Sequence, residues 1–174
     1  MHYYTLHACI LVLTISSCVQ HRNEVHVINT LQNINETNVR SINNLEIDII
    51  ESTLSLANLN LLELENMNLD SVSFNLIYLD YKLYLNCINN IYNSMELVKE
   101  IKKELYNNTN QLGHLKDDYI HSNYRRKDLD RYLDDEKKYI ENTSQDIVET
   151  INIIKLEIEN FNSLNKSIEK IIIK

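Results

Sequence analysis

The stretch IVETINIIKLEIENFNSLNKSIEKII, residues 147–172, contains the pattern that decides the fold. Its apolar residues recur in alternating steps of four and three, with Asn165 holding one position of the repeat: Ile147, Ile151, Ile154, Ile158, Phe161, Ile168 and Ile172. This spacing places them on one stripe of an α-helix and is typical of a coiled-coil seam. Charged residues such as Glu157 and Lys166 lie between the stripe positions. The stretch therefore predicts a long amphipathic helix that packs against other helices.

Asn165 is the one polar residue within this C-terminal seam. A polar side chain at such a position weakens packing and fixes the register or the number of helices. In an Asn-rich chain it can equally be a partly exposed residue. We expect Asn165→Ile to raise thermal stability whether the seam packs within the chain or against a second copy. The seam can be buried by the chain's own helices or by a second copy through residues 140–174. We expect the intramolecular bundle and keep self-association as the alternative.

A second seam runs through the middle of the chain: Met67, Phe74, Ile77, Tyr81, Tyr84, Ile88, Ile91, Met95, Val98, Leu105 and Leu112. Other leucines widen its apolar surface, so this helix is expected to contact more than one neighbour at the centre of a bundle: Leu69, Leu76, Leu79, Leu83 and Leu85. An earlier segment, residues 24–65, has compatible spacing. The predicted fold class is all-α, an elongated antiparallel helical bundle or coiled coil of about three long helices.

Few residues can end these helices, because the chain has no Pro and one Gly among 174 residues. The segment NNTNQLG, residues 107–113, is the strongest predicted turn, since Asn tolerates left-handed backbone angles and Gly113 has no Cβ. ENMNLDS, residues 65–71, is the second, and in it Asn68, Asp70 or Ser71 can cap the following helix. A weaker break is expected within residues 121–130, where the apolar spacing lapses.

Near the N-terminus, ACILVLTISSCVQ, residues 8–20, joins a short apolar run to a cysteine. The run is far shorter than the roughly 20 residues of a membrane-spanning helix, but it suits the apolar region of a signal peptide. Ile15-Ser16-Ser17-Cys18 resembles a bacterial lipobox, in which the cysteine thiol receives a lipid and the chain is cut before it. The preceding MHYYTLH lacks the usual Lys or Arg.

These features predict a signal peptide at residues 1–17, a lipid-anchored tether at residues 18–23 with Cys18 as the lipidation site, and a helical bundle at residues 24–174. A cleaved secretory signal without lipid is one alternative. A buried first strand or helix with an ordinary cysteine is the other.

A signal that ends in Ile-Ser-Ser-Cys before a Pro-free, Asn- and Ile-rich helical chain resembles the small plasmid- or prophage-encoded lipoproteins of Borrelia-type spirochaetes. The resemblance implies attachment to the bacterial outer membrane or cell surface, with a periplasmic or secreted protein as the alternative. Members of that group bind host or complement proteins, and others serve prophage functions that include lysis. We therefore expect a membrane-anchored binding protein with a host or envelope protein as partner. The alternative is a structural or accessory coiled coil, such as a prophage-lysis (holin) accessory or an envelope spacer.

The sequence predicts no enzyme, cofactor or metal site, because it contains no G-x-S-x-G, P-loop or Cys–His pairing. His114 and His121 also lack the i, i+4 spacing that suits zinc. The net charge of −8 argues against a nucleic-acid partner. Cys87, next to Ile88 and near Leu85, is expected to be a small core residue.

One basic and aromatic patch is a candidate partner-binding site: Tyr124, Arg125, Arg126, Lys127, Arg131 and Tyr132. Such a patch can bind an acidic partner or a glycan. The alternative is a solvated helix face, on which Asp128 and Asp130 neutralise the basic residues.

Overall fold

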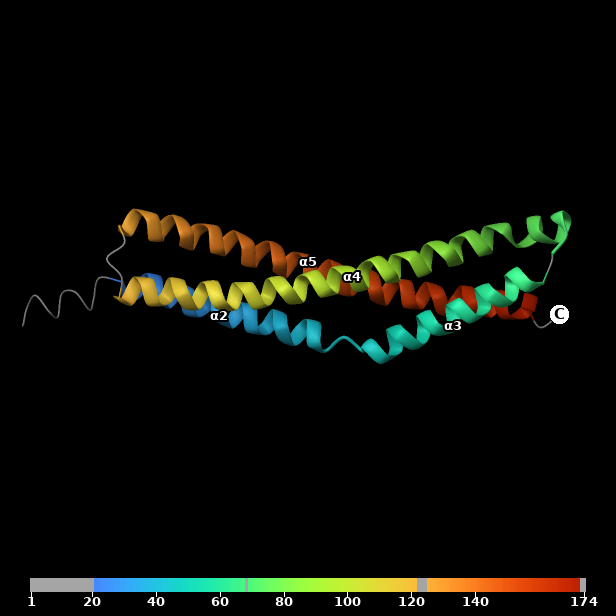
Figure 1. The fold of residues 1–174 in the computed structure, drawn as a ribbon, viewed down its shortest axis with the longest axis horizontal. Coiled ribbons are helices and arrows are strands. Elements are labelled where there is room, and N and C mark those ends of the chain that lie inside the picture. The colour runs from blue at the N-terminus through green and yellow to red at the C-terminus, as the bar shows by residue number, and fades with distance from the viewer. Residues whose placement is uncertain (1–20, 68, 122–124, 173–174) are drawn as a thin grey trace, which may run out of the picture. The chain divides into compact units, whose positions relative to one another are not determined.

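The computed structural model describes residues 21–67, 69–121 and 125–172, which form four helices (Figure 1). They are α2 (Arg22–Asn43), α3 (Ile47–Asn66), α4 (Ser71–His121) and α5 (Arg126–Ile172). Within those described ranges there is no β-strand, so the predicted all-α fold class is confirmed. The predicted signal peptide, Cys18 and Tyr124 lie outside the described residues.

The chain divides into two compact units. Of the described residues, unit 1 contains 21–38, 104–121 and 125–144, and unit 2 contains 39–67, 69–103 and 145–172. Three helical segments pack together in each: α2 with parts of α4 and α5 in unit 1, and mainly α3 with the remaining parts of α4 and α5 in unit 2. In each unit α4 runs antiparallel to its two neighbours (Figure 1). The expected antiparallel packing of three helices therefore occurs within each unit.

The core of unit 1 draws on all three of its segments: Ile28 and Leu31 from α2, Leu112, Leu115 and Tyr119 from α4, and Leu129, Leu133 and Ile140 from α5. The α5 members show that the C-terminal seam begins well before Ile147, which was its predicted start. Glu136 occupies a seam position between them, and one of its carboxylate oxygens is buried without a hydrogen-bond partner. Burial, with the charge of Asp135 as a smaller cause, raises the pKa of Glu136.

The core of unit 2 buries the rest of the C-terminal seam against α3 and α4. Ile147, Ile154, Phe161 and Ile168 are at most 2% exposed, and the Phe161 ring stacks on Tyr84 with 5.4 Å between centroids. Burying each of these side chains contributes about 1.5–3 kcal/mol. The seam is thus covered within the chain. The alternative of self-association through residues 140–174 stays a prediction, and it would need other faces of α5.

The earlier segment, expected as one helix over residues 24–65, is two helices with a break between Asn43 and Ile47. Asn43 and Asn44 have low helix propensity, and the Ile47 amide donates to the Leu45 carbonyl at 2.9 Å, which turns the chain. Helix α3 then begins with Asp48 in its first turn, where a negative charge is favourable. In the sequence, the pair Asn43 and Asn44 is the feature that could have predicted this break.

The turn predicted at residues 107–113 is wrong, because α4 is continuous through it. Leu105 and Leu112 are both buried, and the Asn35 side-chain amide donates to the Leu105 carbonyl at 3.0 Å and to the Thr109 hydroxyl at 2.8 Å. Packing against α2 therefore outweighs the weak helix propensity of Asn and Gly.

The other two predicted breaks are confirmed. Helix α3 ends at Asn66 and α4 begins at Ser71, where an Asp70 side-chain oxygen accepts the Ser73 amide at 2.7 Å. This bond caps α4 and holds the pKa of the Asp70 carboxyl below its usual value. The third break separates α4, which ends at His121, from α5, which begins at Arg126.

Asn165 belongs to a buried hydrogen-bond network that joins all three helices of unit 2. Its side-chain oxygen accepts the Asn60 amide at 2.7 Å and the Tyr84 hydroxyl at 2.9 Å, and its amide donates to Glu169 at 2.8 Å. Asn60, Tyr84 and Asn165 are each at most 7% exposed. Burial raises the pKa of Tyr84, so its hydroxyl remains a donor. The network fixes the register of α3, α4 and α5 in this unit.

We therefore predict that Asn165→Ile lowers the free energy of unfolding by about 1–3 kcal/mol, the reverse of the expectation from sequence. The substitution leaves the Tyr84 hydroxyl buried without an acceptor and leaves the Asn60 amide with only its longer bond of 3.4 Å to the Tyr84 oxygen. Denaturant unfolding followed by circular dichroism measures the change. As a matched control, Asn60→Leu, Tyr84→Phe and Asn165→Ile combined should recover much of the loss. A single Asn165→Ile variant more stable than the natural protein would contradict this role of the network.

Gly113 gives a second prediction, because it lies inside α4 and a Cβ placed there would meet no atom within 4 Å. Glycine within a helix costs about 0.5–1 kcal/mol relative to alanine, so Gly113→Ala should raise the free energy of unfolding by about that amount. Gly113→Pro should lower it by about 3 kcal/mol. If thermal unfolding showed Pro tolerated and Ala destabilising, residues 107–113 would be a turn after all.

Candidate functional site

The basic and aromatic patch lies where α5 begins in unit 1, and its charges are largely engaged within the chain. Arg125 contacts Asp128 at 3.2 Å. Arg126 pairs with Glu24 of α2 and, more distantly, with Asp130.

Two further patch residues pair with each other, since the Arg131 guanidinium lies 5.2 Å from the centre of the Tyr132 ring. The structure thus brings acidic residues in among the basic ones, and the patch presents mixed charge.

Residues beside this patch support the packing of unit 1. The Tyr119 hydroxyl donates to Asp130 at 2.9 Å, and burial together with this hydrogen bond raises the pKa of Tyr119. The His21 ring lies 5.6 Å from the Tyr119 ring. These contacts connect α4 to the starts of α2 and α5. Arg126 and Asp130 therefore have structural roles in this unit.

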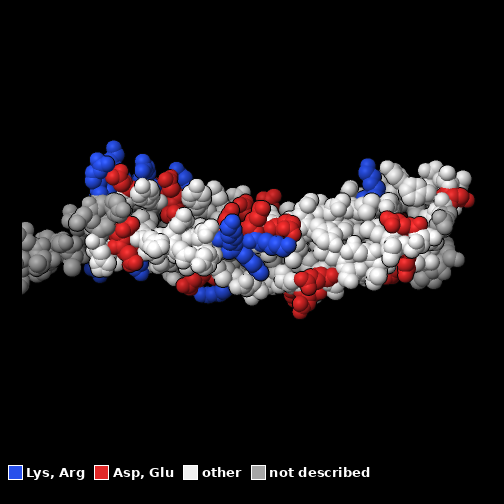
Figure 2. Space-filling model, in the orientation of Figure 1, with Lys and Arg blue, Asp and Glu red and all other residues white. Residues whose placement is uncertain are grey.

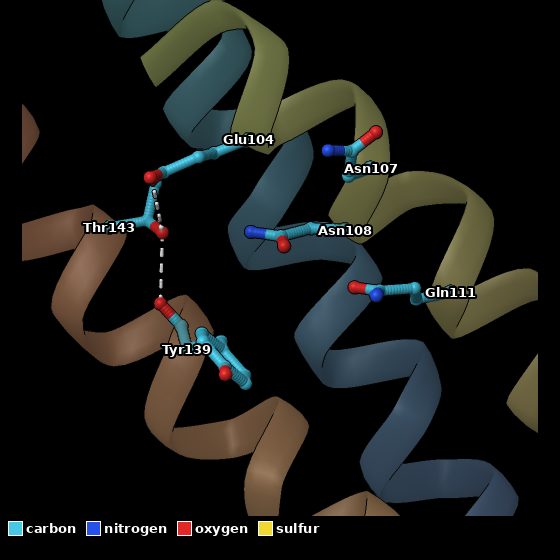
Figure 3. Close-up of a pocket in the computed structure, with 6 residues that line it drawn as sticks. All are labelled: Glu104, Asn107, Asn108, Gln111, Tyr139 and Thr143. Atoms are coloured by element: carbon cyan, nitrogen blue, oxygen red, sulfur yellow. Dashed lines mark hydrogen bonds between the residues drawn. The ribbon is translucent and has the colours of Figure 1, made fainter. Parts of the chain in front are cut away.

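A polar recess of about 260 Å³ lies between α4 and α5 in unit 1 (Figure 3). Its lining is rich in amide, hydroxyl and carboxylate groups: Glu104, Asn107, Asn108, Gln111, Tyr139 and Thr143. The Thr143 hydroxyl donates to the Tyr139 carbonyl at 2.9 Å, and Glu104 lies further away at 3.4 Å. Asn108 is 5% exposed, and its amide nitrogen has no hydrogen-bond partner in the chain.

This recess can hold water or a small polar molecule. Its lining includes one carboxylate and no His, Cys or Lys side chain, so these residues form a surface of hydrogen-bond donors and acceptors. Sequence reasoning missed it, because Asn107, Asn108 and Gln111 were assigned to a turn. On a continuous helix Gln111 lies one turn after Asn107 and Asn108, so the three side chains share a face.

A second recess, of about 410 Å³, lies between α4 and α5 in unit 2 and includes Cys87. The Cys87 thiol donates to the Glu157 carbonyl at 2.9 Å, and it is only 2% exposed, as expected of a core residue. Burial, with this hydrogen bond as a smaller cause, raises the pKa of Cys87 to about 12. The thiol therefore stays protonated and weakly nucleophilic near neutral pH.

The outer side of α4 in unit 2 carries an exposed row of four aliphatic residues, which we call the outer α4 stripe. Val72, Leu76, Leu79 and Leu83 are 72%, 82%, 66% and 46% exposed. They leave open an area on the order of 400 Å², the size of patches that are often functional. The expectation that this helix contacts more than one neighbour is confirmed, since α4 packs with two other segments in each unit, but Leu76, Leu79 and Leu83 are exposed and do not make those contacts.

Helix α3 adds a shorter exposed apolar row in the same unit. Leu56, Leu59 and Leu62 are 39%, 57% and 56% exposed. On the face drawn in Figure 2, the surface formed by α3 and the first part of α4 is mainly white, with few charged side chains. Outward-facing helix positions are normally polar or charged, so unit 2 displays an unusual amount of apolar surface.

Two further properties apply to the part of the chain that the structure describes. No group of three or more His, Cys, Asp and Glu residues is arranged to hold a metal ion. No described helix contains an apolar stretch long enough to cross a membrane.

Comparison of the chain with family models, with curated proteins and with solved structures finds no match.

Proposed function

We propose that the chain is a membrane-anchored interaction protein of the bacterial envelope or cell surface, whose helical bundle presents an apolar helix face to a protein partner. The outer α4 stripe carries this proposal. Its four aliphatic side chains are exposed, whereas the residues of α4 that are buried in the core of unit 2, such as Tyr84 and Ile91, lie further along the helix.

The free energy available from the stripe supports a protein partner. Covering on the order of 400 Å² of apolar surface yields roughly 10 kcal/mol before the entropic cost of association. A lipid surface is a poorer fit, because helices that lie on membranes have a polar face rich in Lys and Arg. Here the flanking charged residues are one acidic and one basic, Asp80 and Lys82.

The anchor in this proposal is Cys18, on the basis of Ile15-Ser16-Ser17-Cys18. Helix α2 begins at Arg22, four residues after that cysteine. An anchor so near the first helix would keep the bundle close to the membrane and would concentrate the chain there. The second candidate function, a structural or accessory coiled coil, is favoured if the stripe joins copies of this chain.

The test uses the full chain in a bacterial host, with a photo-crosslinking amino acid in place of Leu79. We predict a discrete covalent adduct with one protein, identified by mass spectrometry. The same substitution at Tyr106, which is 68% exposed on α4 in unit 1, is the control and should give much less adduct. Cys18→Ala should abolish incorporation of labelled fatty acid and move the protein out of the membrane fraction.

The two halves of this proposal can fail separately. Equal adducts at positions 79 and 106 would remove the interaction surface. Unchanged membrane retention of Cys18→Ala would remove the lipid anchor.

A further inference from the structure

We infer that the polar recess of unit 1 binds a neutral sugar ring, either as a free sugar or as one unit of a polysaccharide. The inference goes beyond the proposed function, because that function concerns the outer α4 stripe of unit 2, whereas the residues that line this recess all belong to unit 1. The two surfaces can therefore be tested independently.

The base of the recess contains a buried hydrogen-bond donor without a partner. Asn108 is 5% exposed and Thr143 is 4% exposed, whereas the other lining residues are exposed and form the rim. The Thr143 hydroxyl donates to the Tyr139 carbonyl, but the Asn108 amide nitrogen has no partner among the described residues. A buried donor of this kind is normally satisfied by water or by a ligand. Because the terminal torsion of Asn is broad, a small rotation directs this nitrogen at an oxygen in the recess.

The charges of the lining exclude two classes of ligand. Glu104 is the one charged residue among the side chains that line the recess. An anion such as phosphate would be repelled by this carboxylate and would have no Lys or Arg beside it. A metal ion would leave the Asn108 donor unsatisfied, because a cation accepts no hydrogen bond. The ligand is therefore neutral and carries oxygen atoms.

Hydroxyl groups match the remaining lining. A hydroxyl has one hydrogen to donate and two lone pairs, so it can accept from Asn108 and donate to the Glu104 carboxylate. Asn107 and Gln111 each add an amide that can donate and accept. In Figure 3 Asn108 and Gln111 extend from α4 toward α5, and Glu104 extends toward Thr143. A ligand with several neighbouring hydroxyls can use these groups together.

The aromatic ring at the rim distinguishes a sugar from a cluster of water molecules. Tyr139 is 63% exposed, and its ring extends from α5 toward α4 (Figure 3). An aromatic face carries partial negative charge and packs against C–H groups, which a sugar ring has and water lacks. The volume of about 260 Å³ is just below the roughly 300–1,000 Å³ of pockets for drug-sized ligands. The recess thus suits one ring.

The size of the ligand sets the expected affinity. One sugar ring has about a dozen non-hydrogen atoms, so its dissociation constant should be on the order of 1 mM. The exposed rim leaves room for a chain to continue on either side of the bound ring. A polysaccharide offers many such rings, so several anchored copies of the chain can be retained on it despite weak individual contacts.

Saturation-transfer NMR on the full chain tests the ligand class, in a detergent without a sugar headgroup. The probes are the methyl glycosides of glucose, galactose and mannose, together with N-acetylglucosamine. We expect at least one of them to receive saturation from the protein. Glycerol is the control for a small molecule with hydroxyls and no ring, and it should give a signal several-fold weaker.

Two variants locate the binding in the recess. Asn108→Leu removes the buried donor and should weaken binding about two- to tenfold, the value of one hydrogen bond. Tyr139→Leu removes the aromatic face and should weaken binding several-fold, and its exposure makes it harmless to the fold. Tyr106→Leu is the matched control, since Tyr106 is 68% exposed in the same unit and does not line the recess. It should bind as the natural protein does, and circular dichroism should be the same for all three variants.

Sedimentation with insoluble chitin or cellulose separates the two sources of the sugar. Retention on the polysaccharide that is lost in Tyr139→Leu identifies a glycan chain as the ligand, and binding of the free sugars alone identifies a free sugar. Three results would overturn the inference. They are no saturation of any sugar, equal saturation of glycerol, and binding that is unchanged in Tyr139→Leu.

Discussion

The seven-residue repeat of buried apolar side chains is the constraint on which the other features depend. On α4 every seventh residue from Tyr84 is at most 3% exposed: Tyr84, Ile91, Val98, Leu105, Leu112 and Tyr119. On α5 the same holds from Leu133, with at most 4% exposure: Leu133, Ile140, Ile147, Ile154, Phe161 and Ile168. These two rows pass through both units, so one repeat builds two cores. Without these apolar side chains, neither unit would have a core for its helices to pack around.

Buried asparagines that pack beside this repeat fix the register of the helices. Asn35 binds the α4 backbone in unit 1, and Asn60 and Asn165 share hydrogen bonds with Tyr84 in unit 2. Apolar rows alone tolerate sliding by one heptad, because every seventh position is equivalent. A buried amide loses its partners if the helices slide, so each network favours one alignment.

The periodicity of the apolar residues was sufficient to predict the all-α fold class, because steps of three and four place residues on one face of an α-helix. It was less reliable for helix ends. Gly113 and its Asn neighbours have turn propensity, yet the heptad row continues beneath them through Leu105 and Leu112, and tertiary packing decided the outcome. The start of the α5 row was missed because Glu136 and Thr143 hold two of its positions. The exposure of Leu76, Leu79 and Leu83 could not be predicted, since a sequence does not say how many neighbours a helix has.

The central claim is that the heptad rows from Tyr84 to Tyr119 of α4 and from Leu133 to Ile168 of α5 are continuous and are buried within the chain. Hydrogen–deuterium exchange of the natural protein, followed by mass spectrometry, tests it most directly. We expect peptides covering residues 105–119 to exchange as slowly as those covering residues 84–98, with faster exchange at residues 44–46 between α2 and α3. Exchange at residues 107–113 as fast as at residues 44–46 would contradict the continuous row.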